Sequence, residues 1–317
     1  MKNKIAIVFP GQGSQAVGMG QDLYNNFQSA REVFAAINDI LSYDLTKIMF
    51  NGPQEELTKT ENTQPALMAV SIALIRVFEQ EFGKKFSDLC SLTAGHSLGE
   101  YSALCASNSL SLGDTAKLLQ IRGSEMAKCA TKNQGAMCAV LGVEIDVAKA
   151  IADEAAQDEI CQVANDNSVG QIVLSGSKNA IERCVEIAKI KGAKRAILLP
   201  VSGAFHSKLM QEAQDKMAIA LNSVTIHKPQ VPVVANITAE IINDHLTIKN
   251  LLINQITQAV RWRETMLCFE KNQIAEVIEI GSGKVLSGLV SRTCPNLKAQ
   301  SIQNLEDLKN FLTNYHG

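Results

Sequence analysis

Long apolar runs are what this 317-residue sequence most plainly lacks. Its basic start, residues 1–4, is followed by an apolar run of only residues 5–9 before a Pro-Gly pair. A secretory signal peptide needs a longer apolar region, and a transmembrane helix needs about 20 apolar residues in succession. We therefore expect a cytoplasmic protein with no membrane partner.

A dominant charge is also missing. The sequence has 30 lysines and arginines against 32 acidic residues, a formal net charge of −2, and its basic residues form no runs. Domains that bind nucleic acids usually carry a basic patch or stripe. The sequence therefore argues against a nucleic-acid partner.

Cys-x-x-Cys pairs are absent as well, although the chain has eight cysteines. Most of them lie within apolar patterns, as is typical of reduced thiols packed in a core. The sequence thus predicts neither a metal site nor a disulfide framework, and it favours a reducing compartment. With 46% hydrophobic residues, the chain is long enough to form one large domain with a smaller inserted one.

The most informative motif lies at 95–99, where the sequence reads Gly-His-Ser-Leu-Gly. It follows the short apolar stretch 91–94 and leads into a helix-like stretch, 98–106. Gly-x-Ser-x-Gly between a strand and a helix is the pattern of a nucleophile elbow, a turn so sharp that only glycine fits on either side. The turn exposes the hydroxyl and aims the helix N-terminus at any negative charge that forms there. Ser97 is therefore the candidate nucleophile.

A serine nucleophile needs a base, and histidine is scarce in this chain. His206 follows a strand-like stretch, 196–201, and a turn of small residues, and Ser207 then begins a helix. Catalytic groups collect at such strand-to-helix junctions of α/β domains. His96 adjoins Ser97, but neighbouring side chains diverge on an elbow, so His206 is the candidate base. The other histidines lie in polar, loop-like surroundings or in the C-terminal tail: His227, His245 and His316.

The strand-like run 5–9 is followed by residues 10–15, which contain two glycines. A dinucleotide fingerprint would need its third glycine earlier than Gly18, and a phosphate-binding P-loop would need a Gly-Lys-Ser/Thr step that is missing. Two possibilities stay open. The segment is either an ordinary tight turn or a loop whose Gln12 N–H joins that of Leu98 in an oxyanion hole.

Strand-like and helix-like segments alternate along the chain, which predicts an α/β fold with a large, doubly wound, mainly parallel sheet. Within it, 136–200 has the β-α-β-β-α-β order of a ferredoxin-like unit. We therefore expect a large α/β domain at 1–128 and 201–317 and a small ferredoxin-like subdomain at 129–200. We also expect three polar residues to end a strand of the small subdomain and cap the turn after it: Asn165, Asn167 and Ser168.

Together these motifs resemble those of the malonyl-CoA:acyl carrier protein transacylases of fatty-acid synthesis, over nearly the whole chain. Their joint occurrence in this order is highly specific. The chain departs from the pattern at Ala204 and Ser282, where proline is often expected, and neither is a proposed catalytic residue. The matching segments are Phe-Pro-Gly-Gln-Gly-Ser-Gln at 9–15, Gly-His-Ser-Leu-Gly-Glu-Tyr at 95–101, Gln-Ile-Arg-Gly at 120–123, Ala-Asn-Asp-Asn-Ser at 164–168 with Gly-Gln at 170–171, Leu-Pro-Val-Ser-Gly-Ala-Phe-His-Ser at 199–207 and Glu-Ile-Gly at 279–281.

The resemblance implies an acyltransferase that moves a malonyl group from malonyl-CoA to the phosphopantetheine thiol of acyl carrier protein by a ping-pong route. Ser97 would be acylated with His206 as base, and no metal or redox cofactor would be needed. Arg122, which taken alone would be expected on the surface, is implied to bind the malonyl carboxylate. Gln255 is implied to hold the His206 ring through its backbone carbonyl, which gives a Ser-His dyad instead of a triad.

Two other classes of protein remain open. A serine hydrolase would share the nucleophile and base, but it would have no use for Arg122 and would usually pair its histidine with a carboxylate. A non-catalytic subunit that binds thioesters or carrier proteins would keep the fold without the chemistry, although an intact Ser97 and His206 argue against it. The lysines and arginines are too scattered to indicate where a carrier protein would dock.

Overall fold

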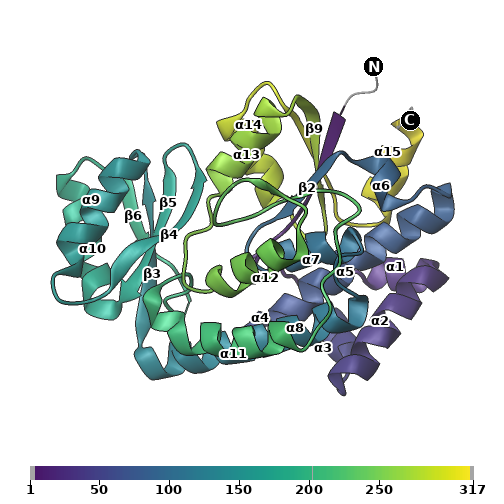
Figure 1. The fold of residues 1–317 in the computed structure, drawn as a ribbon, viewed down its shortest axis with the longest axis horizontal. Helices are drawn as coiled ribbons and strands as arrows, with labels where there is room; N and C mark the ends of the chain where they lie inside the picture. The colour runs from purple at the N-terminus through teal and green to yellow at the C-terminus, as the bar shows by residue number, and fades with distance from the viewer. Residues whose placement is uncertain (1–3, 202, 315–317) are drawn as a thin grey trace.

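The structure is a computed structural model of the chain, and it describes residues 4–201 and 203–314. The expectations that concern residues 1–3, Ser202 and His316 lie outside the described residues. Within the described ranges, no helix combines the length and the apolarity needed to cross a membrane. Two sheets organise the fold, and Figure 1 shows the smaller one at the left with α9 and α10 on its outer side.

The larger sheet has six strands in the order β10-β9-β1-β2-β7-β8. Pairing is parallel from β10 to β7, and β8 runs antiparallel to its neighbour β7. The predicted mainly parallel α/β sheet is therefore confirmed. Its strands are β1 (Lys4–Phe9), β2 (Leu92–Gly95), β7 (Val233–Val234), β8 (Ile241–Ile242), β9 (Ile274–Ile280) and β10 (Lys298–Ile302).

Helices cover both faces of the larger sheet. Ile7 and Phe9 of β1 enter one core with α2 and α5, and Ala6 and Val8 enter a second core with α13 and α14. Burial on both faces explains why the central strands read as continuous apolar runs, and it confirms the doubly wound arrangement. The helices of this part are α1 (Gln21–Asn26), α2 (Gln28–Leu41), α3 (Leu45–Asn51), α4 (Gln54–Thr58), α5 (Thr60–Phe82), α6 (Phe86–Leu89), α7 (Gly99–Ala106), α8 (Leu112–Asn133), the 3₁₀ helix η1 (Lys208–Met210), α11 (Gln211–Asn222), α12 (His245–Asn254), α13 (Trp262–Lys271), α14 (Val285–Thr293) and α15 (Leu305–Asn314).

The smaller sheet has four antiparallel strands in the order β4-β5-β3-β6. With two helices packed on one face, this is the ferredoxin-like arrangement that the sequence predicts. Its elements occupy residues 135–198, directly after α8, and the division of the chain at 129 and 200 remains a proposal. They are β3 (Gly135–Leu141), α9 (Ile145–Ala156), β4 (Cys161–Ser168), β5 (Gln171–Ser177), α10 (Lys178–Ile190) and β6 (Arg195–Leu198).

The two sheets meet along β4. Strand β4 ends at Ser168, directly before the turn to β5, as expected, and Oδ1 of Asn167 accepts from Nε2 of His96 at 2.8 Å. Asn165 lies inside the strand, so the prediction that it ends a strand and caps a turn is wrong. The physical reason is a second partner: the backbone of Val260, just before α13, hydrogen-bonds to β4 on either side of Asn165. This pairing keeps the strand extended and brings its polar side chains to the edge of the larger sheet.

Helix α8 begins after an N-cap, in which the Ser111 hydroxyl accepts from the backbone N–H of Asp114 at 3.0 Å. It then runs against α5. A Cβ at Gly123 would lie 2.5 Å from the carbonyl oxygen of Thr60, so the absence of a side chain there permits the close approach of the two helices. The neighbouring Arg122 is thereby buried between elements of the larger part.

Candidate active site

The turn at 95–99 is so tight that it requires both of its glycines. A Cβ at Gly95 would lie 1.9 Å from the carbonyl group of Gly99, and a Cβ at Gly99 would lie 2.4 Å from the carbonyl oxygen of Phe9. Between them, Ser97 has a φ of 53°, in the left-handed region that residues other than glycine rarely adopt. Strand β2, this turn and helix α7 thus form a nucleophile elbow.

The side chains of Ser97 and His206 meet, although 109 residues separate them in the sequence. The Oγ of Ser97 lies 2.8 Å from Nε2 of His206, and Nδ1 of His206 lies 2.8 Å from the backbone carbonyl oxygen of Gln255. Because a carbonyl oxygen only accepts hydrogen bonds, Nδ1 carries the proton and Nε2 can accept one from Ser97. The structure thus brings these three predicted residues together as a dyad with a carbonyl acceptor.

Burial and the nearby Arg122 guanidinium lower the pKa of His206 to about 3. The side chain therefore stays a neutral imidazole at physiological pH, which is the form that can take a proton. Once protonated, it is a strong acid in this environment.

Arg122 is only 1% exposed. It therefore does not lie on the surface, where an arginine would be expected without the family resemblance. Its Nη1 donates to Oε1 of Gln64 at 2.8 Å. Its Nη2 donates to Oε1 of Gln255 at 2.9 Å and to Oγ of Ser97 at 3.1 Å. All three acceptors are uncharged, so Arg122 has no ion pair within the described ranges, although the nearby Glu100 carboxyl also acts on its charge. A buried cation without an ion pair is energetically costly. The guanidinium is therefore suited to an anionic group bound beside the nucleophile.

Sequence reasoning missed several buried polar side chains at this site. Oδ1 of Asn236 accepts from the Ser97 N–H at 2.7 Å, and its Nδ2 donates to the carbonyl oxygen of Gly95 at 2.7 Å, so this amide holds the elbow on both sides. Oε2 of Glu100 accepts from Nε2 of Gln255 at 2.6 Å, and burial raises the pKa of Glu100 to about 7. Asn236 had one usable signal, because it directly follows the apolar residues 233–235. Glu100 lies within the matching segment 95–101, which assigned it no role, and Gln64 lies on α5, outside every motif.

The loop after β1 packs directly against the elbow. Parallel pairing places Phe9 opposite Gly95, so the two strand ends meet at one edge of the sheet. Across the part of the chain that is described, no hydrogen bond has the N–H of Gln12 or Leu98 as its donor. Both groups are free to bind an oxyanion, which is the role the sequence suggests for them.

Among the described residues, no other histidine side chain hydrogen-bonds to Ser97. Nε2 of His96 donates to Oδ1 of Asn167 at 2.8 Å, and its ring lies 5.5 Å from that of Trp262, so it points toward β4. Burial lowers its pKa as well. His227 and His245 are exposed at the surface.

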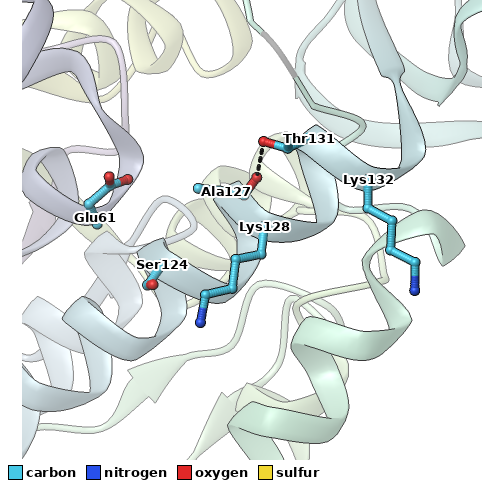
Figure 2. A pocket seen from close by; sticks show the side chains of 6 residues that line it. All are labelled: Glu61, Ser124, Ala127, Lys128, Thr131 and Lys132. Atoms are coloured by element: carbon cyan, nitrogen blue, oxygen red, sulfur yellow. Dashed lines mark hydrogen bonds between the residues drawn. The ribbon is translucent and has the colours of Figure 1, made fainter.

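A separate groove of about 490 Å³ lies beside α8, on the side of this helix roughly opposite Arg122. Figure 2 shows its two lysines extending from the helix, and both are paired with acids: Lys128 with Glu125 at 2.6 Å, and Lys132 with Glu212. No predicted site residue lines this groove, so it is not part of the dyad site. It is lined by Glu61, Ser124, Ala127, Lys128, Thr131 and Lys132.

Sequence comparison identifies relatives over almost the full chain. A family model described as "Acyl transferase domain" matches residues 6–310. The malonyl CoA-acyl carrier protein transacylase of Bacillus subtilis is 40% identical over 308 residues, which cover 97% of this chain and 96% of the relative. The protein of the same name from Escherichia coli is 40% identical over 300 residues, covering 94% and 96%.

Solved structures agree with these relatives. An acyl-carrier-protein-S-malonyltransferase from Bartonella henselae matches with a TM-score of 0.95 and 47% identity, covering 98% of both chains. A malonyl-transacylase solved in complex with a type II PKS acyl-carrier protein matches with a TM-score of 0.94 and 39% identity, covering 98% of this chain and 100% of the other. The chain therefore belongs to the acyl transferase domain family, in its group of malonyl CoA-acyl carrier protein transacylases.

Proposed function

We propose that the protein transfers the malonyl group of malonyl-CoA to the phosphopantetheine thiol of acyl carrier protein through a malonyl ester of Ser97. One observation carries the proposal. The Ser97 hydroxyl lies 2.8 Å from a neutral base, His206, and 3.1 Å from a buried cation, Arg122. A nucleophile beside a cation suits a thioester whose acyl group ends in a carboxylate, and relatives that are 40% identical bear the name of this activity.

In the first half-reaction, Nε2 of His206 takes the Ser97 proton while Oγ attacks the thioester carbonyl carbon. The new C–O bond places negative charge on the carbonyl oxygen, which the N–H groups of Gln12 and Leu98 stabilise. The carbonyl then re-forms, the C–S bond breaks, and CoA leaves as a thiol with the proton from His206. The products are malonyl-Ser97 and free CoA.

The second half-reaction reverses these roles. His206 takes the proton of the phosphopantetheine thiol, and the sulfur attacks the ester carbonyl of malonyl-Ser97. The same two N–H groups stabilise the second oxyanion. The C–O bond breaks, Ser97 takes the proton back from His206, and malonyl acyl carrier protein leaves. Because CoA departs before the carrier protein reacts, the kinetics are ping-pong.

Arg122 selects the acyl group in this proposal. Gln64 and Gln255 orient its guanidinium, and the contact with Ser97 places it next to the reacting carbonyl. A planar guanidinium forms a bidentate pair with a carboxylate, and burial strengthens that pair. An acyl group without a carboxylate gains nothing from this residue.

The cytoplasm is the proposed location. All eight cysteines are free thiols, and seven of them are buried. Free thiols persist in a reducing compartment, whereas secreted proteins usually carry disulfides.

Intact-protein mass spectrometry tests the proposed function. After incubation with malonyl-CoA, the protein should gain one malonyl group, and peptide mapping should place it on Ser97. Adding acyl carrier protein should remove the group and malonylate the carrier. His206→Ala should slow acylation by roughly 10²–10⁴-fold, the usual effect of losing a general base. Ser97→Ala should not be labelled, and the exposed His245→Ala should behave as wild type.

Two outcomes would overturn the proposal. Labelling of a cysteine, or full labelling of Ser97→Ala, would show that Ser97 is not the nucleophile. Rapid loss of the malonyl group to water, without transfer to the carrier, would identify a serine hydrolase instead.

A further inference from the structure

Gln162 lies on β4 of the smaller sheet, outside every motif of the sequence analysis, and its carboxamide reaches the catalytic base. Nε2 of Gln162 donates to the backbone carbonyl oxygens of His206, at 3.3 Å, and Thr257, at 3.1 Å. Its Oε1 accepts from the backbone N–H of Lys208 at 3.2 Å. Both N–H donors and the carbonyl acceptor of this side chain are therefore occupied by backbone groups.

The position of Gln162 follows from the alternation of side chains along β4. Its neighbours Cys161 and Val163 enter the core beneath α9 and α10, so Gln162 points to the opposite face of the sheet. That face meets the turn that contains His206. One half-buried side chain of the smaller sheet thus bonds to two segments of the larger part.

The first of these segments is the turn of the base. His206 has a φ of 57°, a left-handed conformation that residues other than glycine keep only when their surroundings hold them. Gln162 bonds to the carbonyl of His206 and the N–H of Lys208, so its amide brackets the turn directly after the strained residue. The hydrogen bond of Ser207 to the carbonyl of Ala204, at 2.6 Å, stays within the turn and does not link it to another element.

The second segment supplies the acceptor for the imidazole. Thr257 follows two residues after Gln255, whose carbonyl accepts from Nδ1 of His206 at 2.8 Å. A single amide nitrogen therefore joins the backbone of the base to the segment that orients its ring. Both contacts span long sequence separations, 44 and 95 residues.

We propose that Gln162 is a positioning residue for the base, which holds the His206 backbone at a set distance from the Gln255 carbonyl and so directs Nε2 toward Ser97. This inference rests on the proposed function, in which His206 is the base. Gln162 acts through His206 and does not contact the acyl group.

Gln162→Met tests the inference, because methionine keeps the length and volume of the side chain and removes all three hydrogen bonds. The acylation rate and kcat should fall by about 10- to 100-fold, since a misplacement of about 1 Å can cost about 100-fold in rate. The KM for malonyl-CoA should change less than about 3-fold, because the contacts of Arg122 are untouched. Gln300→Met is the matched control: Gln300 is also half-buried on a strand, and its Nε2 donates to Glu276 at 2.6 Å, away from the dyad.

A spectroscopic signature separates positioning from a general loss of stability. The Nδ1–H proton of His206, identified by its disappearance in His206→Ala, should exchange with solvent faster in Gln162→Met than in wild type or Gln300→Met. Wild-type acylation in Gln162→Met, an unchanged exchange rate, or an equal loss of activity in Gln300→Met would overturn the inference. If His206→Ala itself acylates at the wild-type rate, the proposed function fails; if only Gln162→Met does, the positioning role alone fails.

Discussion

In the proposed function, Arg122 is the residue that selects the acyl group. Its truncation in Arg122→Ala leaves the malonyl carboxylate without a partner in a buried site, which typically costs about 2–5 kcal/mol, or roughly 30- to several-thousand-fold in kcat/KM. Acetyl-CoA has no carboxylate, so its kcat/KM should change little. Comparing kcat/KM for both thioesters in wild type and Arg122→Ala checks this, with the exposed Arg292→Ala as control. An equal fall for both substrates would mean that Arg122 has a structural role only.

The protonation of His206 is also set by its neighbours. Its pKa of about 3 means that the ring should not titrate between about pH 8 and about pH 5, whereas an exposed histidine titrates near pH 6.5. The pKa of His206 is lowered and not raised, because burial and the Arg122 charge both disfavour the imidazolium. Arg122→Ala should therefore raise this pKa while burial still keeps it below 6.5. The ring signals of isotopically labelled His206 in an NMR pH titration measure the effect, and an inflection near pH 6.5 in wild type would contradict it.

How far the sequence predicts such residues depends on where their partners lie. Ser97 lies in a local motif of five residues, because the elbow needs a glycine on each side of it. The sequence alone shows this motif. The sequence indicates His206 as the candidate base because it follows a strand-like stretch. Asn236 and Glu100 become part of the site only through contacts with residues far away in sequence. No local pattern encodes such contacts, so the run before Asn236 and the motif around Glu100 could indicate where these residues lie but not which partners they have.

At the scale of elements, the elbow should tolerate no side chain at its first glycine. Gly95→Ala places a Cβ 1.9 Å from backbone atoms of Gly99, so we expect a loss of more than about 4 kcal/mol in the free energy of unfolding, or failure to fold. Gly288→Ala is the matched control. Gly288 is exposed within α14 and a Cβ there meets nothing within 4 Å, so alanine should stabilise the protein by about 0.5–1 kcal/mol. Urea unfolding of both variants measures the difference, and similar values for the two would contradict the steric account.

Element boundaries were predicted less well than element types, for local reasons. Strand β3 begins at Gly135, one residue before the predicted start of the ferredoxin-like unit at 136, and it ends at Leu141 because Gly142 turns the chain with a φ of 84°. Strand β8 was not predicted, since two residues, Ile241–Ile242, are too few to show a period. Asn165 was misplaced because its strand pairing with Val260 overrides the turn preference of asparagine.

For the whole molecule, the junction of the two sheets contains a buried ion pair. Nε of Arg263, on α13, donates to Oδ2 of Asp166, on β4, at 2.9 Å. Burial raises the pKa of Asp166 although Arg263 opposes the change. Arg263→Met leaves this carboxylate buried without its cation, so we expect the free energy of unfolding at about pH 7.5 to fall by about 3 kcal/mol. That is the low end for buried pairs, because the Arg263 side chain is 22% exposed.

The loss relative to wild type should shrink at about pH 5.5. Without Arg263 the folded-state pKa of Asp166 rises further above its unfolded value, so the folded variant binds a proton more tightly than the unfolded chain and is relatively more stable in acid. Urea unfolding at the two pH values checks both the size and the sign. Replacing both partners, with Asp166→Leu and Arg263→Met together, should recover most of the loss. A loss that is the same at both pH values would show that the carboxylate is not the cause.

Ribosomal synthesis produces the two sheets and the two residues of the dyad in a fixed order. The four strands of the smaller sheet are contiguous in sequence and can pair as soon as they emerge, whereas β1 must wait for its neighbour β9, one of the last strands to be made. Ser97 leaves the ribosome 109 residues before its base. A nascent chain that ends before residue 206 therefore carries Ser97 without its base and cannot form the dyad.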